Sequence, residues 1–169
     1  HQFNCNCLIF FLIFERCLFM RAVIQRVSWA KVTVDSEIVG KIEKGLCILL
    51  AIEESDLDQD LEWLVAKING LRIFRDENHA MNLSINDVDG NFLVISQFTL
   101  YASTKKGNRP SFLRSAKPEF AKLMVDKFIS KLEIICGKPV ATGVFGADMK
   151  VELLNDGPVT IIIDTKAKE

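Results

Sequence analysis

The sequence predicts an α/β fold, in which a mixed sheet curls toward a barrel and packs against two main helices in a single domain. Three observations predict it. Two continuous apolar runs have the length of strands buried on both faces, and two longer segments keep apolar residues at helical spacing. The expected strands come in groups rather than alternating strictly with helices, which is typical of mixed sheets. A chain of 169 residues suffices for one such core.

The first half of the domain is predicted to be rich in strands. Residues 21–29, 31–35 and 38–42 are expected to form three of them. Residues 46–52 are continuously apolar, which indicates a strand with both faces buried. The sheet is therefore expected to be built largely before the first helix.

An acidic run leads into the first predicted helix. Residues 53–62 carry six acidic side chains and no basic one. Ser55 followed by Asp58 resembles a capping box, and acidic side chains favour a helix N-terminus. Leucine, valine and isoleucine then keep helical spacing to about Gly70. We interpret the run as a solvated helix start rather than as a binding site.

The second half contains the second helix and the closing strands. Pro118 is suited to the first turn of a helix, and Gly137 is suited to the residue that ends one. His79 falls in a polar loop, where we expect it to be solvated. The predicted segments are a short strand over 71–74, a loop over 76–90, a strand over 91–97, a helix over 118–136, and strands over 149–154 and 159–164.

Residues 1–19 differ from the rest of the chain. The segment begins with histidine, and its apolar run over 8–14 is far shorter than the ~20 residues that span a bilayer. It also lacks the basic start and small-residue cleavage site of a signal peptide. We therefore expect residues 1–19 to be a non-native or upstream extension, residues 20–169 to form the domain, and the membrane not to be a partner.

Cysteine usage and charge narrow the class of protein. The five cysteines are an odd number without the spacing of a disulfide framework or a metal site, which predicts reduced thiols, a cytoplasmic location and no bound metal. The formal net charge is −1, so any nucleic-acid binding must rely on a local group of cations. No glycine-rich phosphate loop follows a strand, and no cofactor is expected.

The chain turns abruptly polar at the end of the second apolar run. Ser96 and Gln97 follow Phe92-Leu93-Val94-Ile95, and Phe98 and Thr99 come next. Backbone N–H groups at such a strand end can stabilise the oxyanion of an acyl-transfer reaction. The alternative is a simple strand end with capped hydroxyls, and the local sequence leaves both open. Thr99 has no base beside it in sequence that would activate it as a nucleophile.

Two further segments carry both a functional and a structural interpretation. Asn155-Asp156-Gly157-Pro158 is either a hairpin turn or a place where glycine permits a close backbone approach. The stretch 102–118 has cations and no acid, which fits either a solvated loop or a set of phosphate contacts. Its candidate phosphate ligands are Lys105, Lys106, Arg109 and Arg114.

Taken together, these residues resemble the D-aminoacyl-tRNA deacylase (D-tyrosyl-tRNA deacylase) family. The resemblance covers residues 20–164, and the extra N-terminal segment is its one departure. Ser96-Gln97-Phe98-Thr99 and Asn155-Asp156-Gly157-Pro158 match the two signatures of the family. Other blocks occur in the expected order: 20–27, 72–74, 81–83, 107–112 and 142–149.

The resemblance implies hydrolysis of the ester of D-aminoacyl-tRNA, and of mischarged glycyl-tRNA, by a homodimer without a cofactor or a DNA partner. It implies that Ser96, Gln97, Phe98 and Thr99 form the catalytic segment at the aminoacylated 3′ end of tRNA. A cis Gly157-Pro158 from the partner subunit would exclude L side chains, with Arg26 holding it in place. The residues that match the adenine pocket are Phe145, Gly146, Ala147 and Met149.

The sequence also leaves rival functions open. Without a base near Thr99, we expect water or the neighbouring ribose hydroxyl to attack the ester. A module that binds the 3′ end of tRNA without turnover would use the same cations of the stretch 102–118, the basic loop. A synthetase-associated editing domain is a second rival, although the sequence shows no second domain or linker.

Overall fold

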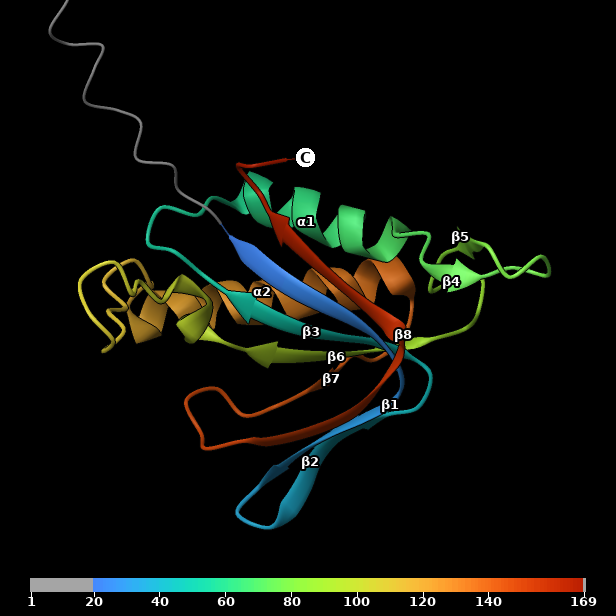
Figure 1. Ribbon diagram of the computed structural model, residues 1–169, viewed down its shortest axis with the longest axis horizontal. Helices are drawn as coiled ribbons and strands as arrows, with labels where there is room; N and C mark the ends of the chain where they lie inside the picture. The colour runs from blue at the N-terminus through green and yellow to red at the C-terminus, as the bar shows by residue number, and fades with distance from the viewer. Residues whose placement is uncertain (1–19, 169) are drawn as a thin grey trace, which may run out of the picture.

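A computed structural model describes residues 20–168, and its centre is one six-stranded mixed sheet (Figure 1). β1 pairs antiparallel with β2, β3 and β8, whereas β3 pairs parallel with β6, and β6 parallel with β7. The sheet strands are β1 (Arg21–Val34), β2 (Glu37–Ile42), β3 (Gly45–Ala51), β6 (Asn91–Ser96), β7 (Ala141–Thr142) and β8 (Lys150–Asp164). The predicted mixed sheet is confirmed.

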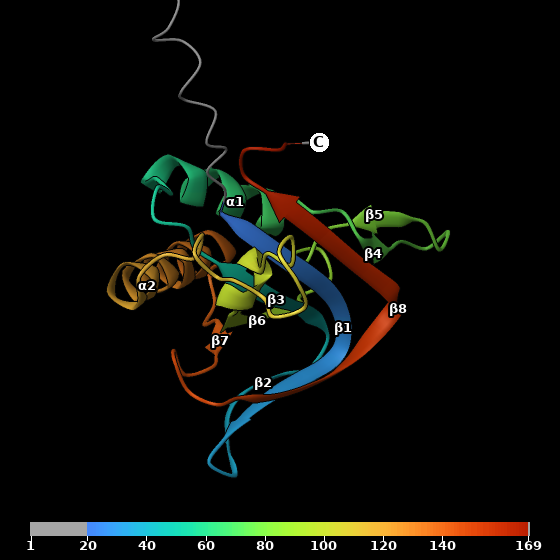
Figure 2. The ribbon, with the colours of Figure 1, turned by 60° about the vertical axis from the view of Figure 1, so that its left-hand side comes forward.

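Two helices cover one side of this sheet. α1 (Asp58–Gly70) and α2 (Pro118–Cys136) pack against each other, and Figure 2 shows β1 and β8 curving together away from them. The main core lies between helices and sheet and includes Ile24, Ile48, Leu64, Phe92 and Phe128. A second apolar cluster fills the opposite, concave side, with Val27, Ala30, Cys47, Leu93 and Ile95 among its members. Burial on both faces explains the continuous apolar runs of β3 and β6, as predicted.

Both ends of the second predicted helix are confirmed. Pro118 is its first residue, where a missing N–H costs no hydrogen bond. Gly137 caps the C-terminus in the left-handed conformation, and its N–H donates to Glu133 O at 2.9 Å. No helix over residues 20–168 is long and apolar enough to cross a membrane.

Two predicted pairs of strands are instead single long strands. β1 continues through Ala30, so the predicted break near that residue is wrong. The predicted turn over 155–158 is wrong as well, because both halves of β8 pair antiparallel with β1 in the same direction. The register passes from Val27↔Asn155 to Gln25↔Thr160, so the extra residues of β8 bulge outward without reversing the chain.

Short elements account for the other corrections. The predicted strand over 71–74 is β4 (Phe74–Arg75), and the loop predicted over 76–90 contains its partner β5 (Met81–Leu83). β7 and the 3₁₀ helix η1 (Phe98–Tyr101) were not predicted. Each has four residues or fewer, too few to produce a hydrophobic period.

The start of α1 also differs from the prediction. The Leu57 N–H donates to Asp60 Oδ2 at 3.0 Å, so the cap lies two residues beyond the predicted Ser55–Asp58 box. Ser55 Oγ itself has no hydrogen-bond partner in the part of the chain that the structure describes. The acidic run is not simply solvated, since Glu53, Asp56 and Asp60 are buried. Tertiary contacts to distant cations, described below, hold part of this run inside.

Two described cysteines are free thiols. Cys47 lies in the second core cluster, and burial raises the pKa of its thiol to about 11. Cys136 is partly buried at the end of α2. The other cysteines and the proposed extension over 1–19 lie outside the described residues.

Candidate active site

A pocket of about 480 Å³ opens at the carboxyl ends of β3 and β6. These strands are parallel, so their ends meet at one edge of the sheet, with Leu50 beside Ser96. Such an edge is where open α/β sheets usually bind ligands. The lining is mostly apolar: Leu50, Ala51, Ile52, Ile95, Ser96, Gln97, Phe98, Ser115, Ala116, Pro118, Ala121, Val125, Phe145, Gly146, Ala147, Met149 and Val151.

The first wall of the pocket is the polar strand end predicted from the sequence. β6 stops at Ser96, and the Gln97 N–H donates to Leu50 O at 2.8 Å, which fixes the turn into η1. Among the backbone hydrogen bonds of residues 20–168, none has the N–H of Phe98 or Thr99 as its donor. The first N–H groups of a helix are commonly free in this way. Two free donors therefore follow the strand end directly.

Thr99 is exposed and does not line the pocket. Its Oγ1 accepts a hydrogen bond from Gln97 Nε2. His79, the histidine within the described residues, is exposed in the turn between β4 and β5, as predicted. No base is thus in contact with the Thr99 hydroxyl among the described residues.

The second wall is the loop between β7 and β8. The Gly143 N–H donates to Val94 O at 3.3 Å, which places this loop beside the end of β6. A Cβ on Gly143 would lie 2.4 Å from Met149 Sδ, so glycine lets that side chain pack inward. The structure brings Phe145, Gly146, Ala147 and Met149 together with Ser96, Gln97 and Phe98, although 46 residues of chain separate the two segments.

Gly157 and Pro158 lie elsewhere on the subunit. They are exposed in the bulge of β8 and do not line the pocket. The register places Ser96 beside Leu50 and Leu50 beside Ala22, whereas the bulge lies opposite Arg26. Four residues along β1 correspond to about 13 Å. The fold of the single chain therefore does not bring Gly157 to the pocket.

The bulge is held rigidly by a buried arginine. Arg26 is 2% exposed, and it donates from Nε to Asp156 O at 2.9 Å and from Nη1 to Ile73 O at 2.6 Å. The Val159 N–H donates to Asn155 Oδ1 at 2.8 Å across the bulge. The Gly157–Pro158 peptide bond is cis, as the resemblance implies.

Glycine is required at position 157 by both conformation and space. Its φ of 147° lies in the region that L side chains rarely adopt. A Cβ there would lie 2.9 Å from the Val159 nitrogen and 3.2 Å from Arg26 Nη2. Any larger residue would displace the bulge or the arginine beneath it.

The basic loop follows η1 and reaches the rim of the pocket. Ser103 and Ser111 exchange backbone hydrogen bonds, and Phe112 contacts Phe98 edge to face with ring centroids 5.1 Å apart. Lys105, Lys106 and Arg109 are exposed on the loop. Arg114 instead pairs with buried Glu53 at 3.2 Å and lies over the Tyr101 ring at 5.4 Å. Sequence reasoning did not identify Glu53 or Tyr101, because neither has a motif around it.

The fold and the pocket define a class of protein: a small mixed α/β protein with a pocket at its strand ends. This pocket is built from backbone groups, hydroxyls and apolar side chains. Among residues 20–168, no three His, Cys, Asp or Glu side chains are grouped so as to hold a metal ion. The family model described as D-Tyr-tRNA(Tyr) deacylase matches residues 23–164. The chain belongs to this family.

Individual relatives agree with that assignment. The D-aminoacyl-tRNA deacylases of Flavobacterium psychrophilum and Bacteroides fragilis are each 61% identical over 150 residues, covering 89% of this chain and 100% of theirs. The solved structure of the c-Myc DNA Unwinding Element Binding Protein has a TM-score of 0.79 at 39% identity, covering 85% of this chain and 97% of that one. A probable eukaryotic D-amino acid tRNA deacylase, at 16% identity, shares the fold with a TM-score of 0.76, covering 87% and 100%.

Proposed function

We propose that this chain hydrolyses the ester of D-aminoacyl-tRNA and releases a D-amino acid and free tRNA. The observation that carries the proposal is the pocket in which Ser96, Gln97 and Phe98 face the loop with Phe145 and Met149. Family membership supports it, since the relatives are D-aminoacyl-tRNA deacylases.

In this pocket the terminal adenosine of tRNA lies against the loop residues Phe145, Gly146, Ala147 and Met149. Their mostly apolar surface suits a planar base. The esterified ribose then points toward the end of β6, next to Ser96 and Gln97. The ester carbonyl comes to lie near the free N–H groups at the start of η1.

Hydrolysis proceeds by attack of water on the ester carbonyl carbon. The new C–O bond creates a tetrahedral oxyanion, which the free N–H of Phe98, a pocket residue, stabilises. A single donor of this kind contributes about 3–4 kcal/mol in known acyl-transfer sites. The ester bond to the ribose oxygen then breaks, and the proton lost by the water ends on that oxygen. Thr99 orients Gln97 and does not form a covalent intermediate.

Chiral selection uses Gly157 and Pro158 of the partner subunit in a homodimer. The bulge is exposed, rigid and outside its own pocket, which are the properties that an element supplied to a second subunit needs. Backbone carbonyls placed against the substrate α-carbon exclude an L side chain and admit a D side chain or the hydrogen of glycine. Mischarged glycyl-tRNA is therefore also a substrate.

The acceptor stem of tRNA is bound by exposed cations of the basic loop. Lys105, Lys106 and Arg109 are available for phosphate contacts because their side chains are exposed beside the pocket rim. Arg114 differs, since it already pairs with Glu53. A local patch of this kind is compatible with the net charge of −1.

The experiment that tests the function is multiple-turnover release of D-tyrosine from D-tyrosyl-tRNA by the purified chain alone. Turnover without any synthetase supports the proposal and contradicts both rival functions. Binding of tRNA without release would identify a module for the 3′ end. Release only after addition of the cognate synthetase would identify an associated editing domain.

A further inference from the structure

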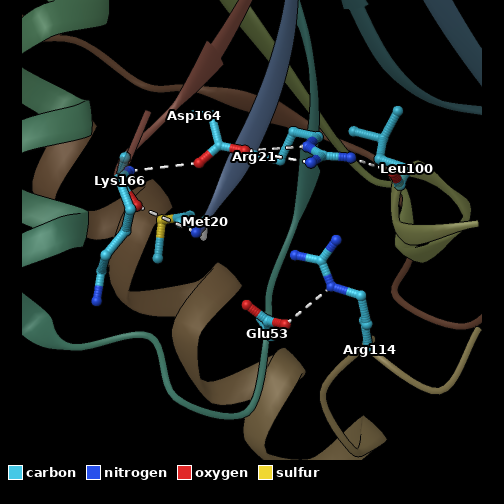
Figure 3. A network of polar contacts seen from close by, with 8 residues as sticks. Met20, Arg21, Glu53, Leu100, Arg114, Asp164 and Lys166 are labelled. Carbon is cyan, nitrogen blue, oxygen red and sulfur yellow. Dashed lines mark hydrogen bonds and ion pairs between the residues drawn. The ribbon is translucent and has the colours of Figure 1, made fainter. Parts of the chain in front are cut away.

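η1, the short helix beside the pocket, is held from two sides by charged residues, of which only Arg114 has been given a possible role above, as a phosphate ligand. Figure 3 shows the network: Arg21 lies between Asp164 and Leu100, and Arg114 faces Glu53. The groups come from β1, β8, the segment before α1 and the basic loop. All of them converge on a helix of four residues.

The first side is a continuous chain of hydrogen bonds. Arg21 donates from Nε and Nη2 to Asp164 Oδ2 at 3.3 and 3.2 Å. Its Nη1 donates to Leu100 O at 2.8 Å, and the Leu100 N–H donates to Gln97 O at 3.2 Å. The end of β8 is thereby connected to the pocket segment through one guanidinium. A guanidinium can hold two acceptors at fixed angles, and an ammonium cannot.

The second side is built on Arg114. Its pairing with buried Glu53 places the next residue, Ser115, so that Ser115 Oγ donates to Phe98 O at 2.9 Å. Glu53 and Ser115 also form a β-bridge. Phe98 is thus held through its carbonyl. Its N–H donates to no backbone carbonyl of residues 20–168.

The two sides meet at Tyr101, the last residue of η1. Its ring is buried, with the Arg21 guanidinium 5.2 Å and the Arg114 guanidinium 5.4 Å from the ring centroid. Within residues 20–168, the Tyr101 hydroxyl has no hydrogen-bond partner. The ring, and not the hydroxyl, therefore makes the contact with both cations.

We propose that Arg21 and Arg114 are positioning residues for ester hydrolysis, which fix η1 so that the N–H of Phe98 stays aimed at the reacting carbonyl. The inference rests on the proposed function and assigns Arg114 to this role rather than to phosphate binding. Neither arginine touches the substrate. Their effect falls on the chemical step, because the adenine-binding loop is a separate wall of the pocket.

The test is steady-state hydrolysis of D-tyrosyl-tRNA by Arg21→Met, with Lys31→Met as the matched control. Lys31 also lies on β1 and pairs with a β8 acid, Glu152, at 3.2 Å, but far from η1. We expect Arg21→Met to lower kcat about 10- to 100-fold while KM stays within about threefold, because small misplacements act mainly on the reaction step. Lys31→Met should match the wild type. Equal kcat in the two variants, per folded molecule, would overturn the role of Arg21.

Two milder changes keep the proposal testable if Arg21→Met does not fold. Asp164→Asn retains the shape of the acceptor, and Arg21→Lys retains the charge. Both should lower kcat with little change in KM, and wild-type kcat in both would refute the inference.

Arg114→Met separates positioning from phosphate binding. Positioning predicts a lower kcat at unchanged KM, with Arg114→Lys more active than Arg114→Met. A raised KM, a weaker salt dependence and unchanged kcat would instead show a phosphate contact and overturn this half of the proposal. If the wild type itself releases no D-tyrosine, the proposed function fails first and the inference fails with it.

Discussion

Thr99 illustrates, at the scale of single residues, how this site differs from one built around a nucleophile. Its hydroxyl accepts a hydrogen bond from Gln97 and faces solvent outside the pocket. A nucleophilic hydroxyl needs a base that takes its proton, and none contacts it among the described residues. We propose instead that the free N–H of Phe98, which lines the pocket, takes part in catalysis.

Thr99→Ala is therefore expected to keep substantial activity, within about tenfold of the wild type. The lost hydroxyl leaves Gln97 Nε2 exposed to water, which replaces the hydrogen bond at little cost. Single-turnover deacylation of D-tyrosyl-tRNA measures the effect. A loss of about 10⁴-fold, which is the scale of removing a true nucleophile, would contradict the mechanism.

Asp56 is the second residue with a specific prediction. Burial raises the pKa of its carboxyl from 3.8 to about 7, and the negative charges of Asp60 and Glu53 add to that rise. The Glu53 N–H bond and the Lys166 charge act in the opposite direction. The folded protein therefore binds this proton more tightly than the unfolded chain does. The resulting stability is present below about pH 4 and is lost as the pH rises through about 7.

Asp56→Asn should remove this pH dependence, because the amide oxygen can still accept from the Glu53 N–H. We expect the melting temperature of the variant to exceed that of the wild type at pH 8, and the gain to be smaller at pH 5. The gain at pH 8 corresponds to roughly 1–3 kcal/mol, or about 2–4 °C per kcal/mol for a chain of this size. Asp58→Asn, an exposed control in α1, should act equally at both pH values. Identical shifts for Asp56→Asn at pH 5 and 8 would contradict the assignment.

At the scale of helices and strands, the sequence predicted the elements whose signal lies within a short stretch of chain. β3, β6 and α2 were found because continuous apolar runs and helical spacing are local signals. The unbroken course of β8 was missed, because Gly157-Pro158 is typical of a turn unless its pairing with β1 is known.

Among the site residues, the sequence predicted Ser96 and Gln97, because they form a polar break after an apolar run. Arg21 and Glu53 were missed, because their partners are 143 and 61 residues away.

The close approach of β3 to the start of β6 gives a prediction at this scale. A Cβ on Gly45 would lie 1.8 Å from Asn91 O, so the first parallel pair of the sheet requires glycine there. Gly45→Ala should lower the free energy of unfolding by about 1–3 kcal/mol, the usual cost of overpacking. Gly70→Ala, where nothing lies within 4 Å, is the control and should be nearly neutral. Urea unfolding compares the two, and equal stability would refute the packing argument.

At the scale of the whole molecule, the pocket and the Gly157-Pro158 bulge lie apart on one chain. The pocket lies at the ends of β3 and β6, whereas the rigid Gly157-Pro158 bulge lies outside it on β8. In the homodimer that we propose, assembly of two copies would join them. An L substrate would then meet the backbone of the neighbouring subunit, and a D substrate would not.

The most direct measurement is kcat/KM for D-tyrosyl-, L-tyrosyl- and glycyl-tRNA with the wild type and with Gly157→Ala. We expect the wild type to hydrolyse the D and glycyl esters and to leave the L ester intact. Gly157→Ala should narrow the ratio of D to L hydrolysis, because its Cβ would displace the bulge that we propose excludes L side chains. Hydrolysis of D and L esters at equal rates by the wild type would contradict the central claim, and an unchanged ratio in the variant would remove Gly157 from the chiral filter.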